Sequence, residues 1–513
     1  MAAEHPILVI IIPLISALII PLVSRINRDF GWFTALAGTF LSFICAFNLL
    51  SGVIETGRIS YHLGGWKPPW GIEYAVDHLN GFVLVIITFI AFAVVYYSKK
   101  SVDKEIGEEK APLFYSVYML FVTGITGVTI TGDIFNLYVF IEITSLSAYT
   151  LIAMGSRREA LIASFNYLIL GTIGGTFILI GVGYLYMVTG TLNMADLSRL
   201  LPELYSSNAV RTAFAFFTVG LSLKIALFPL HIWLPKAYTE APSAVSAVIA
   251  ATATKVMAYV LIRIMFTVFT VDFDVNVLPL TTILIVLSSI AIIMGSVLAV
   301  AQTNLKRMLA YSSIGQIGYI VLGVALVNKL AMTGALIHIL NHALMKGTLF
   351  MVAGIIVYTT GAANISELRG MGKKMPFTMA AFTIAALSMI GVPLTVGFTS
   401  KWYLALGALE ADMWYLIPVI LISSLLTAVY FWRIVESIYF AKPKEEVAEE
   451  NTIKAPPSMV LATCVLSILC IVFGVFAYIP ASVTDAAAER LLNPDKVVEH
   501  LEQPWKDKGG AHH

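Results

Sequence analysis

The sequence predicts an all-α polytopic membrane protein with about fourteen transmembrane helices. Of its 513 residues, 58% are hydrophobic and 12% are charged, whereas a soluble domain carries about 25% charged residues. Apolar runs of about 20 residues, the length that crosses a bilayer as a helix, recur along the whole chain. The formal net charge is +1, so no basic surface is available for nucleic acid. These observations exclude a soluble enzyme and a nucleic-acid-binding protein.

Each expected span is an apolar run bounded by charged or turn-forming residues. The first run is expected to be a retained helix, because neither a basic segment before it nor a cleavage site after it marks a signal peptide. A short turn at Thr131-Gly132-Asp133 divides one long run into two helices. The expected spans lie near 7–24, 30–52, 79–98, 112–131, 134–154, 161–189, 209–235, 243–265, 278–301, 308–328, 333–357, 376–407, 413–440 and 459–480.

The distribution of lysine and arginine predicts how the chain is oriented. These residues gather in one set of alternate loops, for example at Lys99, Lys100, Lys306 and Arg307, and are sparse in the other set. The positive-inside rule places the basic loops in the cytoplasm. We therefore expect a multi-pass protein of the cytoplasmic (inner) membrane with both termini on the outer side.

Four lysines, Lys224, Lys255, Lys346 and Lys401, lie deep within the expected spans. A lysine at the middle of the bilayer costs about 3 kcal/mol on the most lenient scale, so four of them indicate a function. Two arginines, Arg263 and Arg433, fall near helix ends. Long side chains at such positions can extend to the interface, and we expect both arginines to do so.

Glu142 is an acid buried well within an expected helix. An isolated carboxylate there would take up a proton, whereas a lysine across a helix interface would keep it ionised. Lys224 is the candidate partner. A static ion pair that holds two helices together is the alternative.

Two expected spans are interrupted by proline. Lys224 precedes Pro229 by five residues, and His231 follows Lys224 by seven, which returns it to nearly the same helical face. The later span is interrupted at Pro393 and is followed by Lys401. Freed carbonyl groups are tolerated at membrane depth only against protein or water. Broken helices in corresponding halves indicate an inverted repeat with an ion path at the breaks.

His338, His342 and Lys346 have spacings of four and eight residues, so they share one face of a helix. No carboxylate or cysteine nearby completes a metal site, and we expect no metal. The three cysteines show no C-x-x-C spacing, and no phosphate-binding loop is present, so no cofactor is expected. Desolvation lowers the pKa of lysine, and histidine titrates near neutrality. A row of these groups is typical of a proton pump or exchanger.

Four segments resemble one known family. The stretch from Ser222 to Pro242 is similar to the signature of the antiporter-like subunits of respiratory complex I, a family that includes Mrp-type cation/proton antiporters and membrane-bound hydrogenases. The segments Asn304–Tyr319, His338–Lys346 and Gly391–Lys401 resemble further family motifs. The run Gly132–Glu142 is most similar to the D-type subunits of Mrp antiporters and their hydrogenase relatives.

The resemblance implies fourteen helices with two inverted five-helix repeats at 112–265 and 278–440. A three-helix segment, 1–111, would precede them, and the last helix and tail, 459–513, would follow. It also implies that Glu142 and Lys224 form a pair whose approach and separation tune the lysine, and that Lys255 links this pair to the next group. Further along, the resemblance makes His338, His342 and Lys346 central proton carriers and Lys401 the terminal lysine.

The expected function is that of a proton-translocating subunit in a multi-subunit membrane complex, using Mrp-type Na⁺/H⁺ antiport. Its partners would be other membrane subunits, protons, Na⁺ and lipids, with no nucleic acid. The alternative is an ion-pumping subunit of a redox-driven complex, so membership of an oxidoreductase stays open. A self-contained solute transporter would need a substrate-shaped midplane site, and a passive anchor would not need four deep lysines.

Overall fold

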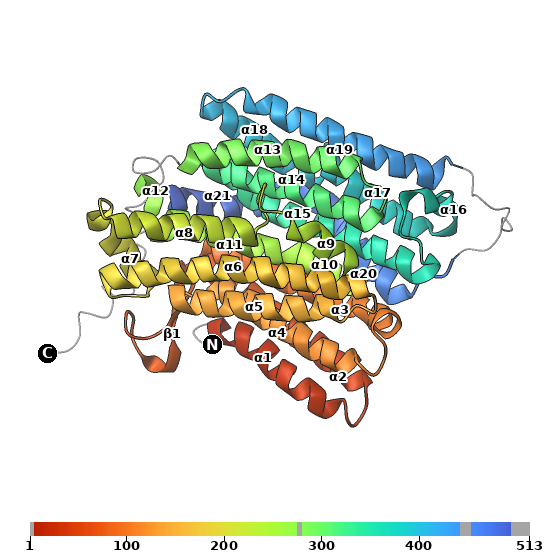
Figure 1. Ribbon diagram of the computed structural model, residues 1–513, viewed down its shortest axis with the longest axis horizontal. Coiled ribbons are helices and arrows are strands. Elements are labelled where there is room, and N and C mark those ends of the chain that lie inside the picture. Colours follow the sequence, from red (N-terminus) through yellow and green to blue (C-terminus); the bar gives the residue numbers. More distant parts are fainter. Residues whose placement is uncertain (1–4, 274–279, 442–452, 494–513) are drawn as a thin grey trace.

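The computed structural model describes residues 5–273, 280–441 and 453–493. Over these residues the chain is a bundle of long helices that lie side by side (Figure 1). Twelve helices in the described part are long and apolar enough to cross a membrane. The all-α polytopic class is therefore confirmed.

The continuous spans agree with the apolar runs of the sequence. One of them, Ser243–Val268, contains two π-helical turns. It begins with α10 (Ser243–Val248), continues through the π-helical turn η4 (Ile249–Ala253) and α11 (Thr254–Arg263), and ends with the π-helical turn η5 (Ile264–Val268). The other spans are α1 (His5–Val23), α2 (Asp29–Thr56), α3 (His78–Glu105), α4 (Ala111–Ile130), α5 (Ile134–Ala153), α6 (Arg158–Thr189), α13 (Leu280–Val300), α14 (Leu305–Ala325), α15 (Lys329–Thr360), α19 (Leu416–Tyr439) and α20 (Pro457–Val475).

The remaining two expected spans are interrupted helices. The first consists of α8 (Asn208–Lys224) and α9 (Trp233–Glu240), and the second of α17 (Pro376–Ile390) and α18 (Val396–Glu410). Pro229 and Pro393 lie in the two breaks, where proline cannot continue a helix. Each break also holds a non-glycine residue with positive φ, Ala226 at 58° and Leu394 at 70°. Such backbone is costly and persists where the surrounding structure enforces it. All fourteen expected spans thus correspond to helices, two of them broken.

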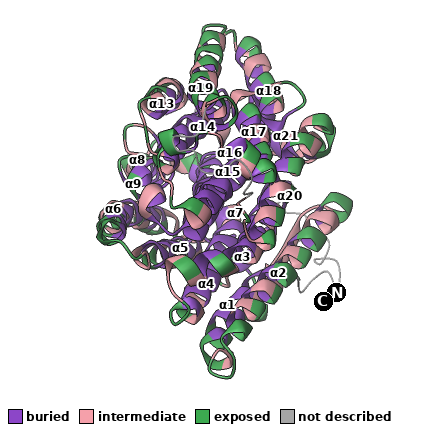
Figure 2. Ribbon diagram, turned by 90° about the vertical axis from the view of Figure 1, so that its right-hand side faces the viewer, coloured by how far each residue is buried: buried purple, intermediate pink, exposed green. Residues whose placement is uncertain are grey.

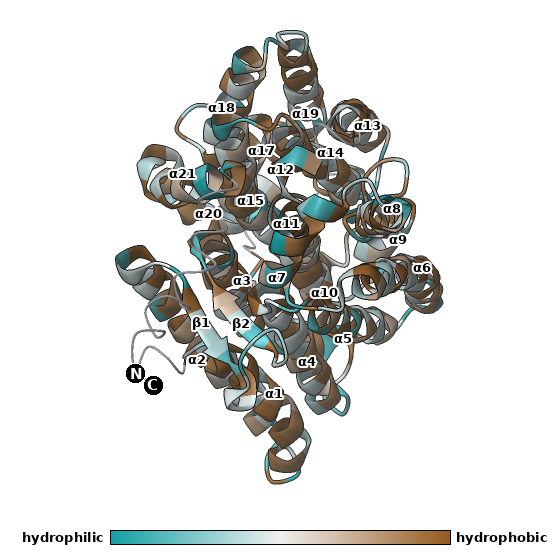
Figure 3. Ribbon diagram, turned by 90° about the vertical axis from the view of Figure 1, so that its left-hand side faces the viewer, coloured by the Kyte–Doolittle hydropathy of each residue, from teal (hydrophilic) through white to brown (hydrophobic). Residues whose placement is uncertain are grey.

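A few short elements connect the spans. Residues between α2 and α3 form an antiparallel hairpin of β1 (Ile59–His62) and β2 (Glu73–Val76), with Ile59 opposite Val76. Hydropathy did not reveal this hairpin, because four-residue strands are too short to give a clear alternating pattern. The short helices are α7 (Met194–Leu200), α12 (Thr270–Asp272) and α16 (Met371–Lys374), and α21 (Tyr478–Leu492) follows the last span. Figure 3 looks onto the end of the bundle where the hairpin lies, and there the hairpin and α7 carry hydrophilic residues.

The bundle has a buried centre and an apolar periphery. Every residue of α15 from Ala331 to Ile356 is buried, and the same holds from Ala241 to Thr270 around α11. By contrast, α1, α2 and α19 expose large apolar side chains such as Leu18, Phe47 and Leu425, a pattern suited to contact with lipid. Figure 2 shows this division, with buried residues in the middle and exposed ones on the outer helices. These two central helices carry Lys255, His338, His342 and Lys346.

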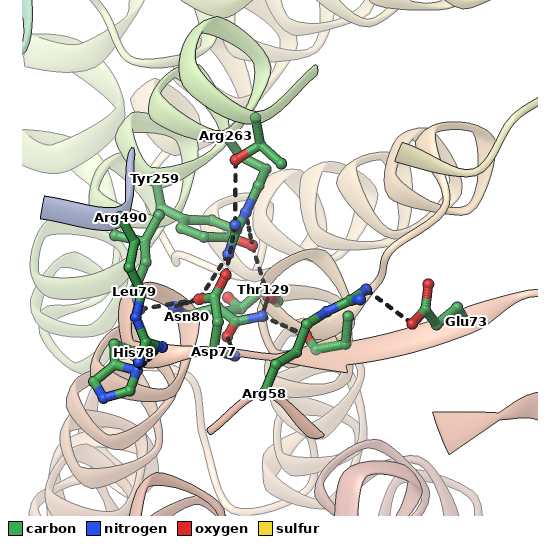
Figure 4. A network of polar contacts seen from close by, with 12 residues as sticks. Arg58, Glu73, Asp77, His78, Leu79, Asn80, Thr129, Tyr259, Arg263 and Arg490 are labelled. Carbon is green, nitrogen blue, oxygen red and sulfur yellow. Dashed lines mark hydrogen bonds and ion pairs between the residues drawn. The ribbon is translucent and has the colours of Figure 1, made fainter. Parts of the chain in front are cut away.

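A polar network ties the hairpin end of the bundle together (Figure 4). Asp77 caps α3 by accepting hydrogen bonds from the backbone N–H groups of Leu79 and Asn80. Its carboxylate also contacts Arg263 of α11, with Oδ2 2.7 Å from Nη1 and Oδ1 3.0 Å from Nη2. Burial opposes ionisation of Asp77, but the Arg263 guanidinium outweighs it and holds the pKa of the carboxyl well below its usual range.

The two arginines expected near helix ends, Arg263 and Arg433, differ in burial. Arg263 was expected to extend to the interface, but it is 8% exposed and is buried against Asp77, because a carboxylate lies within its reach. Arg433 is exposed and donates hydrogen bonds to the carbonyl groups of Val300 and Gln302. The first arginine therefore joins elements of the fold, and the second ties α19 to the end of α13.

We predict that Asp77→Asn lowers the free energy of unfolding by about 3 kcal/mol, because Arg263 loses the charge that offsets its burial. Asparagine can still cap α3, so the substitution tests the ion pair alone. The Asp77 carboxyl has a lowered pKa in the folded state, so its contribution is complete above about pH 4 and is lost below it. Thermal unfolding in detergent should therefore separate variant and wild type at pH 7 and bring them closer in acid.

Glu55→Gln is the matched control, because Glu55 is exposed at the end of α2. Its unfolding temperature should equal that of the wild type. An unchanged unfolding temperature for Asp77→Asn at pH 7 would show that the ion pair does not contribute to the free energy of unfolding as predicted.

Candidate functional site

The structure brings Glu142 of α5 against Lys224 at the end of α8. Glu142 Oε1 lies 3.2 Å from Lys224 Nζ, and Ser145 Oγ accepts a second hydrogen bond from Nζ at 2.8 Å. Lys224 is 4% exposed, so its ammonium group depends on these two partners. The carboxylate and the hydroxyl of two α5 residues thus bind the ammonium group of Lys224, the last residue of α8.

His231 is not on a continuous helix with Lys224. Because α8 ends at Lys224 and α9 begins at Trp233, the seven-residue helical spacing does not apply to this pair. His231 is half-buried, and its ring stacks on Phe228 with centroids 5.0 Å apart. Within the described chain, its Nδ1 is buried without a hydrogen-bond partner. The structure places His231 in the break of the first interrupted helix.

Lys255 lies in the middle of the bundle, directly after the π-helical turn η4. It is fully buried, and its Nζ donates hydrogen bonds to the carbonyl of Ala250 and, at 3.4 Å, to Thr254 Oγ1. A π-helical turn displaces backbone carbonyls from the regular pattern and often marks a functional position. The turn therefore supplies an oxygen ligand for the lysine from its own helix.

The three residues predicted to share one face of a helix are all on α15 and are fully buried. His338 Nδ1 lies 2.8 Å from Ser400 Oγ of α18, and the rings of His338 and His342 have centroids 6.1 Å apart. Lys346 Nζ donates to the carbonyl of Leu309 at 2.8 Å and to Ser312 Oγ, both on α14.

Lys401 binds the backbone at the break of the second interrupted helix. Its Nζ donates to the carbonyl groups of Met389 and Ile390 at 3.0 Å and 2.9 Å, and to Ser424 Oγ at 2.9 Å. The first two are carbonyls at the end of α17 that the break leaves without helical partners. Nζ also lies 5.2 Å from the ring centroid of Tyr319.

Tyr319 connects Lys401 with the histidines. Its ring lies between the lysine and His338, whose ring centroid is 5.6 Å away. Sequence reasoning did not single out Tyr319, although it ends the Asn304–Tyr319 motif. The hydroxyl partners Ser145, Ser312, Ser400 and Ser424 were also missed, because serine is common in membrane helices and only the tertiary contacts distinguish them.

Three buried ring nitrogens of the α15 histidines have no protein partner among the described residues. They are both nitrogens of His342 and Nε2 of His338. Buried polar atoms are normally hydrogen-bonded, to protein or to water. These positions therefore suit bound water molecules. Within the described ranges, no group of three His, Cys, Asp or Glu side chains could hold a metal.

Proteins of known sequence place these residues in a family. The family model described as NADH:quinone oxidoreductase/Mrp antiporter, TM, matches residues 131–427, which is more than half of the chain. NADH-quinone oxidoreductase subunit N of Desulforudis audaxviator is 45% identical over 93% of this chain and 96% of its own. The D-type subunit of the Na⁺/H⁺ antiporter of Bacillus subtilis is 31% identical over 96% of this chain and 98% of its own.

A solved structure supports the same relationship. A chain in the membrane-bound sulfane sulfur reductase, an archaeal respiratory membrane complex, superimposes with a TM-score of 0.90 at 32% sequence identity. The match covers 97% of this chain and 100% of the other. The protein is therefore a multi-pass membrane protein that belongs to the NADH:quinone oxidoreductase/Mrp antiporter family.

Proposed function

We propose that this protein is the proton-translocating subunit of a multi-subunit membrane complex that exchanges Na⁺ for protons, as Mrp-type antiporters do. The observation that carries the proposal is the row of titratable side chains through the bundle, six of which are buried. It comprises the pair Glu142 and Lys224, then Lys255, then His338, His342 and Lys346, and finally Lys401, with His231 in the first break. A passive structural role gives no reason to bury so many ionisable groups.

The Glu142–Lys224 pair is the proposed entry to the row. When the carboxylate lies against Nζ, it stabilises the ammonium form of Lys224, and when it withdraws, the lysine releases a proton more readily. The released proton raises the charge near Lys255, which acts on His342 and Lys346 in turn. Lys401, held at the second break, is the proposed last carrier.

Two cavities support access for water at both ends of the bundle. One of about 270 Å³ is lined by Glu105, Glu240 and Lys306. The other, of about 70 Å³, is lined by Asp77 and Tyr259. They lie at opposite ends of α3, which runs for 28 residues, or about 42 Å. We place the larger cavity on the cytoplasmic side and both termini on the outer side of the cytoplasmic membrane.

We also propose that residues 112–265 and 278–440 are two inverted repeats, between an N-terminal segment 1–111 and a C-terminal segment 459–513. The two broken helices support this division. Each half holds one helix that is broken at a proline and carries a lysine beside the break, and broken helices at corresponding places are typical of inverted repeats.

A redox-driven pump is the second candidate function. The observation in its favour is that a relative 45% identical to this chain is named as a subunit of an NADH-quinone oxidoreductase. Mild detergent extraction from native membranes, followed by mass spectrometry of the co-purifying proteins, separates the candidates. Iron–sulfur or nickel-containing subunits would establish the redox-driven pump, whereas small hydrophobic partners and related large subunits would establish the gradient-driven antiporter.

We predict that Lys224→Ala abolishes ion exchange while the complex still assembles. The truncation removes the amine that Glu142 and Ser145 hold, and with it the first proton carrier. Exchange is measured in proteoliposomes as the proton flux that follows a step in Na⁺ concentration, and assembly as recovery of the co-purifying subunits. Lys100→Ala, at an exposed position of α3, should exchange normally. Wild-type flux in Lys224→Ala would rule out the proposed role.

We predict that Gly175→Ala reduces exchange without unfolding the protein. An added Cβ at Gly175 of α6 would lie 2.2 Å from Glu142 Oε1, so the flexible carboxylate must turn away from Lys224. Proton flux should fall about tenfold, because one hydrogen bond to a charged group contributes about 1.5 kcal/mol. Gly183→Ala is the control on the same helix, since nothing lies within 4 Å of its added Cβ. Equal fluxes in the two variants would show that the position of Glu142 is unimportant.

A further inference from the structure

Helices α14 and α15 face one another along the row of titratable groups. They are joined by a short turn at residues 326–328 and run in opposite directions. Two contacts fix how they are aligned. Lys346 of α15 donates a hydrogen bond to Ser312 of α14, and His338 of α15 lies beside Tyr319 of α14.

This alignment places a further side chain, Gln316, opposite His342. Gln316 follows Ser312 by four residues on α14, and His342 precedes Lys346 by four residues on α15. Because residues four apart share one face of a helix, the two positions fall at the same level of the antiparallel pair. Gln316 therefore occupies the gap between the Ser312–Lys346 contact and the Tyr319–His338 contact.

Both side chains are buried with unsatisfied polar atoms. Gln316 is 2% exposed and His342 is fully buried. Within the described residues, Gln316 Oε1 and both ring nitrogens of His342 have no hydrogen-bond partner. An amide offers an acceptor and two donors, so it can bind either ring nitrogen. One water molecule between two such groups at the same level can satisfy both of them.

We infer that Gln316 is a positioning residue for His342, a role that rests on the proposed proton translocation. A water molecule between the two side chains donates a hydrogen bond to Gln316 Oε1 and accepts one from a ring N–H of His342, and so fixes the ring and its tautomer. The other ring nitrogen then presents its lone pair to an incoming proton. A neighbouring lysine ammonium gives up that proton and becomes a neutral amine, while the imidazole becomes imidazolium and conserves the total charge.

The charged and titratable groups around His342 come from two helices. Lys255 faces it from α11, and Lys346 and His338 face it from α15 itself. Gln316 is the uncharged member of this group on α14. A neutral amide can orient the ring without repelling the positive charges that pass through it, whereas a further cation at this position would oppose them.

The test compares two variants of nearly the same shape in the intact complex. Gln316→Met keeps the volume but removes the amide, and Gln316→Glu keeps an acceptor at the same place. We expect Gln316→Met to slow proton flux at least tenfold and to shift the midpoint of its pH profile by about half a unit, because the proton carrier loses its positioning group. Gln316→Glu should recover flux to within about threefold of the wild type.

Ile320→Val is the control for a change in the packing of α14, since Ile320 is a buried apolar residue of that helix. It should leave both rate and pH profile unchanged. Wild-type flux or an unshifted pH profile in Gln316→Met would overturn the inference, and so would equal losses in Gln316→Met and Gln316→Glu. Lys224→Ala is measured in the same series, so that normal flux there would identify failure of the proposed function itself.

Discussion

The need to satisfy each buried ammonium group without bulk water constrains this structure more than any other interaction. Three of the deep lysines meet it with backbone carbonyls. Lys255 uses Ala250 of a π-helical turn, Lys346 uses Leu309, and Lys401 uses Met389 and Ile390 at a helix break. Irregular backbone is tolerated at membrane depth where protein or water satisfies it. Lys255 and Lys401 therefore depend on irregular backbone, which supplies the carbonyl oxygens that bind their ammonium groups.

The two ends of the row hold their lysines in chemically different ways. Lys224 is bound by a carboxylate, and Lys401 is bound by neutral carbonyl and hydroxyl oxygens. A carboxylate that moves changes the local charge by a full unit, whereas a carbonyl dipole changes it far less. A movement of the Glu142 carboxylate relative to Lys224 therefore has a larger electrostatic effect than a similar movement of the oxygens around Lys401. Between them, the uncharged residues Ser400 and Tyr319 contact His338 without adding charge.

The periphery of the bundle supports this centre in a different way. The hairpin, the cap of α3 and the end of α11 are joined by the Asp77–Arg263 pair, which fixes the position of the helix that carries Lys255. Gly174 of α6 lets α8 approach closely, since an added Cβ at Gly174 would lie 3.1 Å from the carbonyl oxygen of Gly220. Close backbone approach through small residues is a common way to pack membrane helices.

The sequence by itself determined the fourteen spans, the two proline breaks and the deep lysines, because hydropathy and the cost of burying charge are properties of the local chain. It could not determine the partners. The spacing of His231 from Lys224 assumed a continuous helix. Arg263 was assigned to the interface because it lies near a helix end, and its partner Asp77 is far away in sequence. Tyr319, Ser400 and Gln316 carry no distinguishing local signal. Only the tertiary structure decides which hydroxyl, carbonyl or amide faces a buried amine, because those contacts depend on the alignment of helices that are distant in the chain.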